Sequence, residues 1–515
     1  MSLLKEIYEK IEQATIYPSI QTPLEKAHAL SEKLGCAIYL KREDLQPVFS
    51  FKCRGASNKI SRIKEDPLVR QYGVIAASAG NHAQGVALAA KGLGISATIV
   101  MPKTTPSIKI DAVKALGGMV ILHGDSYDEA YAHALSLGEK NQQPFIPAYD
   151  DIDVIAGQGT IAKELDEQVD LKNIGVVYVP VGGGGLFAGI ASYLSQTHPH
   201  IDVIGVEHEG SACLSEAMKK NERVILAHVD LFADGVAVNR VGEIPFDVAQ
   251  ELLYFSVTVT SDEICAAIQD IFEATRIIAE PSGALALAGL KKHHLSSKMG
   301  HEKKDSIAIV SGANMNFDRL QYVVERAKVG AKQELLFGIT IPEKVGSFSK
   351  FLHQLHNLLG RISISEFNYR LSPHSSVAHV LVGLSFSDAC NAMGTLVEEE
   401  LPKQGYAVVN LTHNEMAKLH IRHMVGGRAP SVTNERIFRF EFPERPGALQ
   451  TFLDHLGEKW NITLFHYRNH GAACGRVLAG LQIPNNEIDV FQDSVRKLGY
   501  FSQEETENDA YTLFL

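Results

Sequence analysis

The chain has 515 residues, more than one hydrophobic core usually organises, so we expect at least two domains. Hydrophobic residues make up 45% and charged residues 21%, a balance that excludes a disordered chain. The net charge is −11 and no dense basic run occurs, which argues against a nucleic-acid partner. The six cysteines form no CxxC pair, which disfavours disulfides and structural zinc and favours a reducing cytoplasm.

The N-terminal segment, MSLLKEIYEKIEQ over residues 1–13, predicts an amphipathic helix with charges from Lys5 onward. It lacks the apolar centre and the cleavage site of a secretory signal. The longest uncharged run, residues 173–201, is long enough for a membrane span, but VPVGGGG near its middle predicts a strand, a loop and a helix. We therefore expect no membrane partner.

The stretch SFKCRGA, residues 50–56, places the ammonium of Lys52 between Phe51 and Cys53 in a segment that otherwise suits burial. A lysine in a partly dry site has a lowered pKa and can attack an aldehyde. The alternative is a surface lysine whose stem lies along apolar neighbours. This residue alone does not decide between the two.

Short β-rich runs alternate with helical patterns over residues 73–310. The runs are uninterrupted and apolar, as is typical of strands buried on both faces of a parallel sheet: GVIAAS, ATIVM, MVILHG, VVYVPV, DVIGVE and SIAIVSG. We expect an α/β domain with helices covering the sheet.

A candidate carboxylate site lies in ASAGNHAQGVALAA, residues 77–90, where Gly80 and Asn81 open a helix after a strand. Ser78 and the backbone amides of this turn could bind a carboxylate or simply cap the helix.

Four consecutive glycines in VVYVPVGGGGLFAGIASYL, residues 176–194, stand between a predicted strand and a helix. Backbone N–H groups without side chains at a helix start suit a phosphate. A dinucleotide site is the rival interpretation, because Gly183, Gly185 and Ala188 satisfy G-x-G-x-x-A and Glu207 ends the next strand. A tight turn that binds no ligand is the third interpretation of these glycines.

An internal repeat follows residue 325. TIPEKVGSFSKFLHQL (340–355) matches EFPERPGALQTFLDHL (441–456), and FNYR (367–370) matches FHYR (465–468) in the same order. We predict two related β-α-β modules over residues 335–425 and 435–515, joined by a linker over 326–334 to the α/β domain over 1–325. Regulation is the first hypothesis for the modules, and an oligomerising role is the alternative.

The motifs SFKCRGA, ASAGNHAQG, VGGGGL, AEPSGA and VSGANMN, in this order and spacing, resemble the pyridoxal-phosphate-dependent enzymes of fold type II, the tryptophan synthase β-like family. The resemblance covers residues 15–325. With the two C-terminal modules, the whole chain resembles the biosynthetic threonine dehydratases, also called threonine deaminases. This implies an α/β catalytic domain of two parallel-sheet subdomains followed by tandem α+β modules similar to ACT domains.

The resemblance also implies the roles of individual residues. Lys52 would bind the cofactor aldehyde covalently and act as the catalytic base, and Phe51 would lie against the ring. Asn81 would contact the 3′ oxygen, Ser311 would meet the pyridine nitrogen, and the phosphate would rest on Gly182, Gly183, Gly184, Gly185 and Leu186. The substrate carboxylate would be surrounded by Ser78, Ala79, Gly80 and His82.

The implied reaction converts L-threonine into 2-oxobutanoate and ammonia, the first step of isoleucine biosynthesis. A serine partner leaves the pyridine nitrogen less protonated than a carboxylate would, which favours loss of a β substituent. A serine-preferring dehydratase of the same fold and an NAD-dependent dehydrogenase are the alternatives. Amino-acid racemases of this superfamily place a serine where this chain has Ala79, so we expect no racemisation.

No divalent metal is expected. Glu207 matches a metal ligand of some relatives, but Ser211 and Cys213 stand where a carbonyl-supplying alanine and an aspartate would be expected.

The resemblance implies that the modules bind isoleucine as an inhibitor, with valine opposing it. The turns PEKVG and PERPG would place Gly346 and Gly447 near an effector, and Tyr369 and Tyr467 are the aromatic candidates for binding it. The family is usually tetrameric, so we expect a homotetramer.

Overall fold

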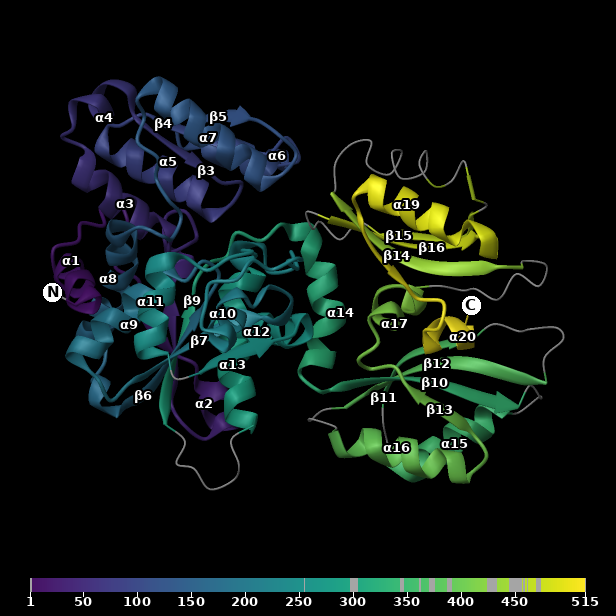
Figure 1. Ribbon diagram of the computed structural model, residues 1–515. Coiled ribbons are helices and arrows are strands. Elements are labelled where there is room, and N and C mark those ends of the chain that lie inside the picture. The colour runs from purple at the N-terminus through teal and green to yellow at the C-terminus, as the bar shows by residue number, and fades with distance from the viewer. Residues whose placement is uncertain are drawn as a thin grey trace. The chain divides into compact units, whose positions relative to one another are not determined.

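The computed structural model describes residues 2–253, 255–296, 304–342, 347–360, 363–369, 376–386, 391–423, 433–443, 456, 459–460, 462–468 and 474–514. It divides into two compact units, Met1–Phe317 and Asp318–Leu515. Each unit has its own sheets and cores (Figure 1). In the part of the chain that these ranges cover, no helix has both the length and the apolar character needed to cross a bilayer.

A six-stranded sheet organises the first unit. Its order is β1 (Leu24–Lys26), β2 (Ile38–Arg42), β9 (Asp305–Val310), β6 (Ile174–Pro180), β7 (Asp202–His208) and β8 (Ser256–Val259). Only the pairing of β1 with β2 is antiparallel. The central strands β6 and β9 are almost entirely buried, as their apolar runs predicted.

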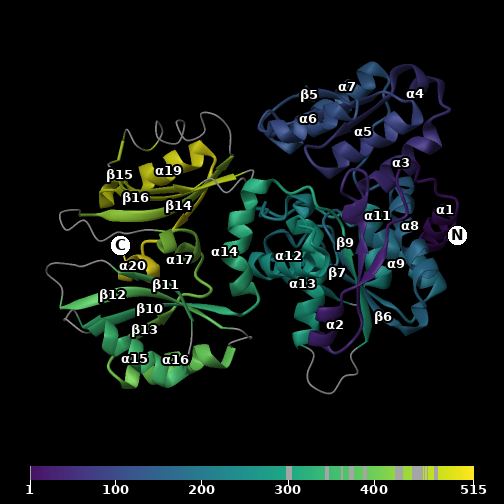
Figure 2. The ribbon, with the colours of Figure 1, turned by 180° about the vertical axis from the view of Figure 1, so that it is seen from behind.

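Helices cover both faces of this sheet (Figures 1 and 2). One apolar core joins the sheet to α1 (Leu3–Glu12), α8 (Ile152–Gln168), α9 (Gly185–Thr197), α10 (Cys213–Lys220) and α11 (Glu243–Leu252). The opposite side carries α2 (His28–Leu34), α12 (Ser261–Thr275) and α13 (Pro281–Ser296). The predicted N-terminal helix is confirmed, and Leu4, Ile7 and Ile11 are its buried face.

A second, three-stranded parallel sheet lies within the same unit, in the order β3 (Val74–Ala77), β4 (Ala97–Met101) and β5 (Met119–Leu122). One face packs on α3 (Lys52–Ile63), α4 (Pro67–Tyr72), α5 (Asn81–Leu93) and α6 (Ser107–Ala115). The other face packs on α7 (Tyr127–Asn141). The expected α/β domain with two parallel-sheet parts is confirmed, whereas β1, β2 and β8 were not predicted.

The second unit contains two sheets of the same topology, which confirms the repeat. The first has the order β11 (Ser363–Tyr369), β12 (Val377–Ser385), β10 (Glu334–Pro342) and β13 (Ala407–Asn410), with α15 (Ser347–Leu359) and α16 (Asn391–Lys403). The second has the order β15 (Ile462–Arg468), β16 (Cys474–Gln482), β14 (Glu435–Pro443) and β17 (Phe501–Glu504), with α19 (Ile488–Leu498). Both carry a register shift at the equivalent place, Ile364/Glu366 and Ile462/Leu464.

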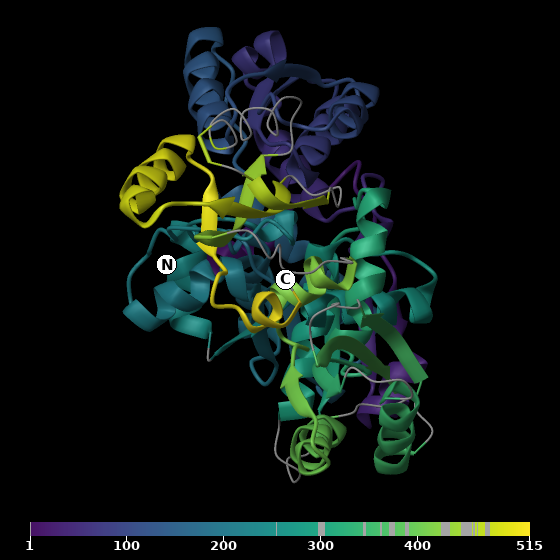
Figure 3. The ribbon, with the colours of Figure 1, turned by 90° about the vertical axis from the view of Figure 1, so that its right-hand side faces the viewer.

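A shared apolar core joins the two modules. It includes residues of both sheets and of the short helices α17 (Glu415–Leu419) and α20 (Asp509–Phe514), which lie between the sheets (Figures 1 and 3). Asn414 donates a hydrogen bond to Asn508 at 2.9 Å, and each side chain also caps its own helix start. The helix α14 (Leu320–Gly330) leads into β10.

Candidate active site

Lys52 is the first residue of α3 and lies at the centre of the candidate site. Its Nζ donates a hydrogen bond to the carbonyl oxygen of Ala148 at 3.0 Å and lies 5.2 Å from the centre of the Phe51 ring. Burial lowers the pKa of the amine to about 8, although the nearby Glu280 carboxylate opposes this shift. The environment therefore makes Lys52 a good nucleophile and base at neutral pH.

Asn81 links the site to two residues from distant parts of the chain. It opens α5, its Nδ2 donates to Glu280 Oε1 at 2.6 Å, and its Oδ1 accepts a hydrogen bond from Asn314 at 2.7 Å. Burial raises the pKa of Glu280 to about 7. Asn81 is thus held by a donor on one side and an acceptor on the other, which fixes the direction of its amide.

Ser311 and the glycine loop follow the carboxyl ends of neighbouring strands, β9 and β6. This is the edge of an α/β sheet at which ligands bind. The Ser311 hydroxyl is buried and donates to the carbonyl of Ser282 at 3.2 Å, while the Ser311 carbonyl accepts from the N–H of Phe51 at 3.2 Å. The strand end therefore lies directly beside the start of the lysine helix.

The glycine loop is packed so closely that side chains do not fit. A Cβ on Gly183 would lie 2.2 Å from the Tyr149 ring, and one on Gly185 would lie 2.7 Å from the Tyr149 carbonyl oxygen. Gly184 has a φ of 90°, in the left-handed region that favours glycine. Gly185 then begins α9, so free backbone N–H groups collect at the start of a helix.

These parts meet through a continuous set of contacts. Ala148, which accepts from Lys52, directly precedes Tyr149, which covers the glycine loop. A Cβ on Gly182 would lie 2.8 Å from the backbone of Val236, and one on Gly235 would meet the Ser282 hydroxyl. The lysine, the loop and Ser311 are therefore brought to one place.

The residues expected to surround a carboxylate lie at the start of α5. Gly80 N–H donates to the Ser78 hydroxyl at 3.1 Å, and a Cβ on Gly80 would meet no non-neighbouring atom within 4 Å. His82 donates from Nε2 to the carbonyl of Ile146 at 2.9 Å, because a carbonyl can only accept. Burial, and then the Lys52 charge, lower the pKa of His82 to about 4, so the ring is neutral.

Comparison with known proteins identifies this arrangement. A family model for pyridoxal-phosphate-dependent enzymes matches residues 17–312, and one for the C-terminal regulatory domain of threonine dehydratase matches residues 325–421 and 426–515. The biosynthetic L-threonine dehydratase of Burkholderia multivorans is 49% identical over 98% of this chain and 98% of its own length. The mitochondrial threonine dehydratase of Saccharomyces cerevisiae is 48% identical over 98% of this chain and 88% of its own.

The chain belongs to the biosynthetic threonine dehydratases. Among solved structures, the processed form of threonine deaminase isoform 2 from Solanum lycopersicum is 49% identical, with a TM-score of 0.60, over 63% of this chain and 93% of that one. The expected family, its fold and pyridoxal phosphate as the cofactor are confirmed.

The residues of this dehydratase fit the cofactor. The glycine loop offers a phosphate a cradle that a single Cβ would fill, with helix α9 behind it. Lys52 offers an amine whose pKa is lowered toward neutrality. The roles assigned to the individual residues stay predictions.

The dinucleotide interpretation of the glycine loop is wrong, because the matching family uses pyridoxal phosphate. In addition, the Glu207 carboxylate is already hydrogen-bonded within the protein. Its carboxylate accepts from the backbone N–H groups of Leu214 and Ser215 at 2.7 and 2.8 Å, within the first turn of α10. Burial raises the pKa of Glu207 to about 7.

The sequence did not identify Asn314 and Tyr149 as residues of the site. It left two roles possible for Glu280, either shaping the rim of the active site or capping the following helix. In the structure the Glu280 side chain accepts from Asn81, and its backbone carbonyl accepts from Ala284 N–H in α13. The motif VSGANMN already contained Asn314. Tyr149 carried no local signal.

The four candidate effector residues are less fully described. Tyr369 ends β11 and Tyr467 lies in β15, the equivalent strand of the second module. Gly346 and Gly447 lie outside the described residues.

A pH test follows from the environment of Lys52. At pH 8 about half of an amine with this pKa is neutral, against less than about 1% for an ordinary lysine. We expect the rate at which pyridoxal phosphate attaches to the apoprotein to be half-maximal near pH 8, followed by absorbance. Because Glu280 raises the lysine pKa, Glu280→Gln should move this midpoint to lower pH. A midpoint near the ordinary lysine value would contradict the burial of the amine.

Proposed function

We propose that this dehydratase converts L-threonine into 2-oxobutanoate and ammonia as the first step of isoleucine biosynthesis, and that its C-terminal unit regulates the reaction. The observation that carries the proposal is the convergence of a lysine with a lowered pKa, a glycine cradle and Ser311 in one site, in a chain that also matches the regulatory domain of threonine dehydratase.

Lys52 has two parts to perform in this reaction. It would hold the cofactor aldehyde covalently, and as a free neutral amine it would take the proton from the substrate Cα. The cofactor supplies an electron-withdrawing ring that makes this proton removable. Lys52 is suited to the base role because burial favours its neutral form, and Ala148 directs its Nζ.

Ser311 and Asn81 would orient the cofactor ring. Asn81 is held by Glu280 and Asn314, while the Ser311 hydroxyl, whose single proton goes to the Ser282 carbonyl, would have to turn that proton to the pyridine nitrogen. A hydroxyl at the pyridine nitrogen carries no charge, which favours elimination of the threonine hydroxyl over a long-lived carbanion. Phe51 would lie against the ring, as expected.

The start of α5 would bind the substrate carboxylate through Ser78, Ala79, Gly80 and His82. Backbone N–H groups at a helix start favour an anion, and a Cβ on Gly80 would meet no non-neighbouring atom within 4 Å. The neutral His82 spends its single N–H on the Ile146 carbonyl, so it would line this site without adding a charge. Ala79 carries no exchangeable side-chain proton, so the product is an oxo acid rather than the D-amino acid.

Isoleucine is the proposed inhibitor, with valine opposing it, at sites that include Gly346, Tyr369, Gly447 and Tyr467. Matched positions in two modules of equal topology support paired sites. A homotetramer and a cytoplasmic location complete the proposal, the latter supported by the scattered cysteines.

The test is a 2-oxo acid assay on protein reconstituted with pyridoxal phosphate, using threonine and serine, with and without isoleucine. We expect threonine to give the higher kcat/KM, although one methyl group is worth only about 1–3 kcal/mol of discrimination. Isoleucine should weaken threonine binding by about 5- to 150-fold. No oxo acid from threonine would refute the activity, a preference for serine would favour the serine dehydratase, and an unchanged rate with isoleucine would remove the regulatory part.

A further inference from the structure

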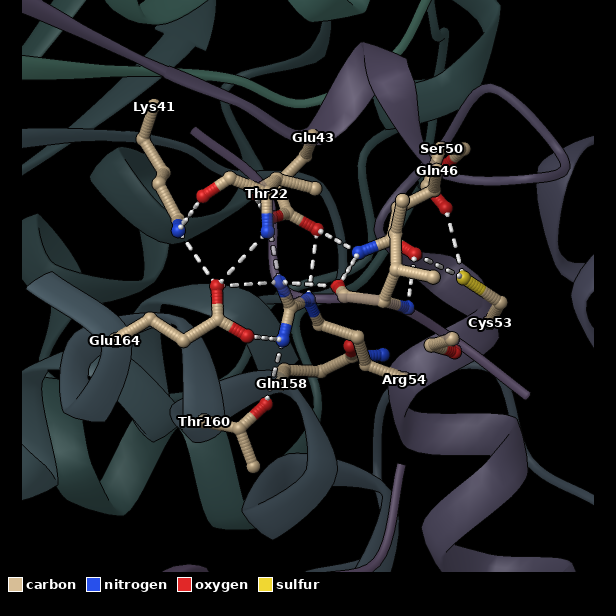
Figure 4. Close-up of polar contacts among 12 residues, drawn as sticks. Thr22, Lys41, Glu43, Gln46, Ser50, Cys53, Arg54, Gln158, Thr160 and Glu164 are labelled. Atoms are coloured by element: carbon tan, nitrogen blue, oxygen red, sulfur yellow. Dashed lines mark hydrogen bonds and ion pairs between the residues drawn. The ribbon is translucent and has the colours of Figure 1, made fainter. Parts of the chain in front are cut away.

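Four charged side chains are buried together beneath the lysine helix: Lys41, Glu43, Arg54 and Glu164. We call them the Arg54 cluster (Figure 4). Lys41, Glu43 and Arg54 are fully buried, and Glu164 is 7% exposed. They come from β2, the 3₁₀ turn Glu43–Leu45, α3 and α8. The cluster holds two cations and two carboxylates, so it is neutral overall.

The Arg54 guanidinium stands at the centre of the cluster and uses all of its donors. Its Nε and Nη2 donate to Glu43 at 2.7 and 2.8 Å, and its Nη1 and Nη2 donate to Glu164 at 2.5 and 2.8 Å. Nη1 also donates to the Thr160 hydroxyl at 3.1 Å. Figure 4 shows this fork between the two carboxylates. One side chain therefore ties α3 to α8 and to the 3₁₀ turn.

The other members hold the acceptors in place. Lys41 Nζ donates to Glu164 at 2.6 Å and to the Thr22 carbonyl at 2.7 Å, and the Thr22 hydroxyl donates to Glu43 at 2.5 Å. Burial would raise the pKa of Glu43, but Arg54, Lys41 and the Thr22 hydrogen bond together outweigh burial, and the pKa lies below its ordinary value. Both partners of the fork are thus fixed by further contacts.

Stability alone is a poor reason for this cluster. Buried ion pairs add little over well-packed apolar residues of the same volume, because desolvation offsets the attraction. What an arginine fork between two carboxylates does provide is a defined geometry, since both the guanidinium and the carboxylate are planar and bind in pairs.

That geometry is imposed on the turn of α3 that carries Lys52, two residues from Arg54. A Cβ on Gly157 of α8 would lie 2.6 Å from Gly55 Cα, and one on Gly85 of α5 would lie 2.9 Å from Cys53 N. No side chain separates these helices at the contacts, so the backbone beside Lys52 cannot shift without moving its neighbours.

The glycine loop is tied to the same frame through α8. A Cβ on Gly189 of α9 would lie 2.7 Å from Gly159 N of α8. The helix that follows the glycine loop is therefore packed backbone to backbone on the helix that Arg54 grips.

We propose that Arg54 is a positioning residue of the reaction: it clamps the first turn of α3 to α8, and through them sets the place of the Lys52 amine relative to the glycine loop that holds the cofactor phosphate. This inference rests on the proposed function. It adds that the rate of Lys52 chemistry depends on a guanidinium that touches neither cofactor nor substrate.

The test compares Arg54→Lys with Arg42→Lys. Arg42 is a matched control, because it is also buried, at 2% exposed, and also donates Nε and Nη2 to one carboxylate, that of Asp44, at 3.0 and 2.8 Å. The measurements are Tm, kcat and KM for threonine, and the rate of covalent cofactor attachment to the apoprotein, followed by absorbance and by mass after borohydride reduction. Thr160→Val, which removes only one acceptor from the fork, is included in case Arg54→Lys does not fold.

We expect Arg54→Lys to lower kcat and the attachment rate by at least about 10-fold with KM within about 3-fold, since misplacement by an ångström can cost about 100-fold. Thr160→Val should show a smaller loss in the same direction. Arg42→Lys should lower Tm but leave both rates unchanged. Equal rate losses in Arg54→Lys and Arg42→Lys would overturn the inference, and so would wild-type rates in Arg54→Lys. If Arg54→Lys does not fold, wild-type rates in Thr160→Val would overturn it. If wild-type protein shows no cofactor fixed to Lys52, the proposed function fails instead.

Discussion

Replacing Lys52 by alanine is expected to lower the rate of 2-oxobutanoate formation by about 10³- to 10⁴-fold, because one residue supplies both the covalent hold on the cofactor and the general base. The Nζ lies within 3.0 Å of Ala148 O and is the amine whose pKa burial lowers to about 8. The measurement is 2-oxo acid formation at saturating pyridoxal phosphate. Mass spectrometry after borohydride reduction should show cofactor on wild-type protein and none on Lys52→Ala.

Lys59→Ala is the matched control for this variant. Lys59 lies on the same helix, and its Nζ pairs with Asp151 at 2.7 Å and Asp153 at 3.3 Å. We expect a small loss of stability and an unchanged rate. A small primary amine added to Lys52→Ala should restore part of the activity if the missing group acts as a base. Turnover by Lys52→Ala within tenfold of wild type would show that another residue does this chemistry.

Local patterns account for the parts of the structure that the sequence predicted correctly. The apolar runs of β3, β4, β6, β7 and β9 are buried on both faces of parallel sheets, a condition that leaves a signature in each strand alone. The glycine loop is similar, since only glycine fits against the Tyr149 ring. Each constraint leaves its mark in a few consecutive residues, so it can be recognised without knowing the fold, even where its source, such as Tyr149, lies elsewhere in the chain.

Strand β2 shows why other elements were missed. Its sequence IYLKR ends in Lys41 and Arg42, so it lacks the apolar run of its neighbours, yet both charges are buried. They are tolerated because Glu164 pairs with Lys41 and Asp44 pairs with Arg42. A partner such as Glu164, 123 residues away, cannot be recognised from the strand itself.

The contacts within the active site also join residues that lie far apart in the sequence. Asn81 meets Glu280 and Asn314, which are 199 and 233 residues further along the chain. The sequence contained both residues within conspicuous motifs, but nothing local indicated that Asn81 lies between them. Only the folding of the two sheets into one unit brings these motifs together.

Gly183→Ala is expected to weaken both the stability of the catalytic unit and its binding of the cofactor while leaving the reacting amine intact. The new Cβ would lie 2.2 Å from Cγ of Tyr149, and this atom is near the backbone, so the side chain cannot swing away cheaply. We expect the free energy of unfolding to fall by about 1–3 kcal/mol. The loop should also be displaced, and cofactor affinity, titrated on the apoprotein, should fall by about 10- to 100-fold because the phosphate loses aligned N–H donors.

The comparison with Gly394→Ala separates this steric effect from the general effect of adding a methyl group. Gly394 lies in α16, where a Cβ would meet its nearest atom at 3.5 Å, an ordinary contact. We expect this variant to bind the cofactor normally and to gain up to about 1 kcal/mol of stability, since alanine is the better helix residue. A double-mutant cycle then tests the cause. In a Tyr149→Ala background, Gly183→Ala should weaken cofactor binding far less than in wild type. Additive losses in the cycle would show that the ring of Tyr149 is not what keeps position 183 a glycine, and that the loop is selected for its backbone conformation instead.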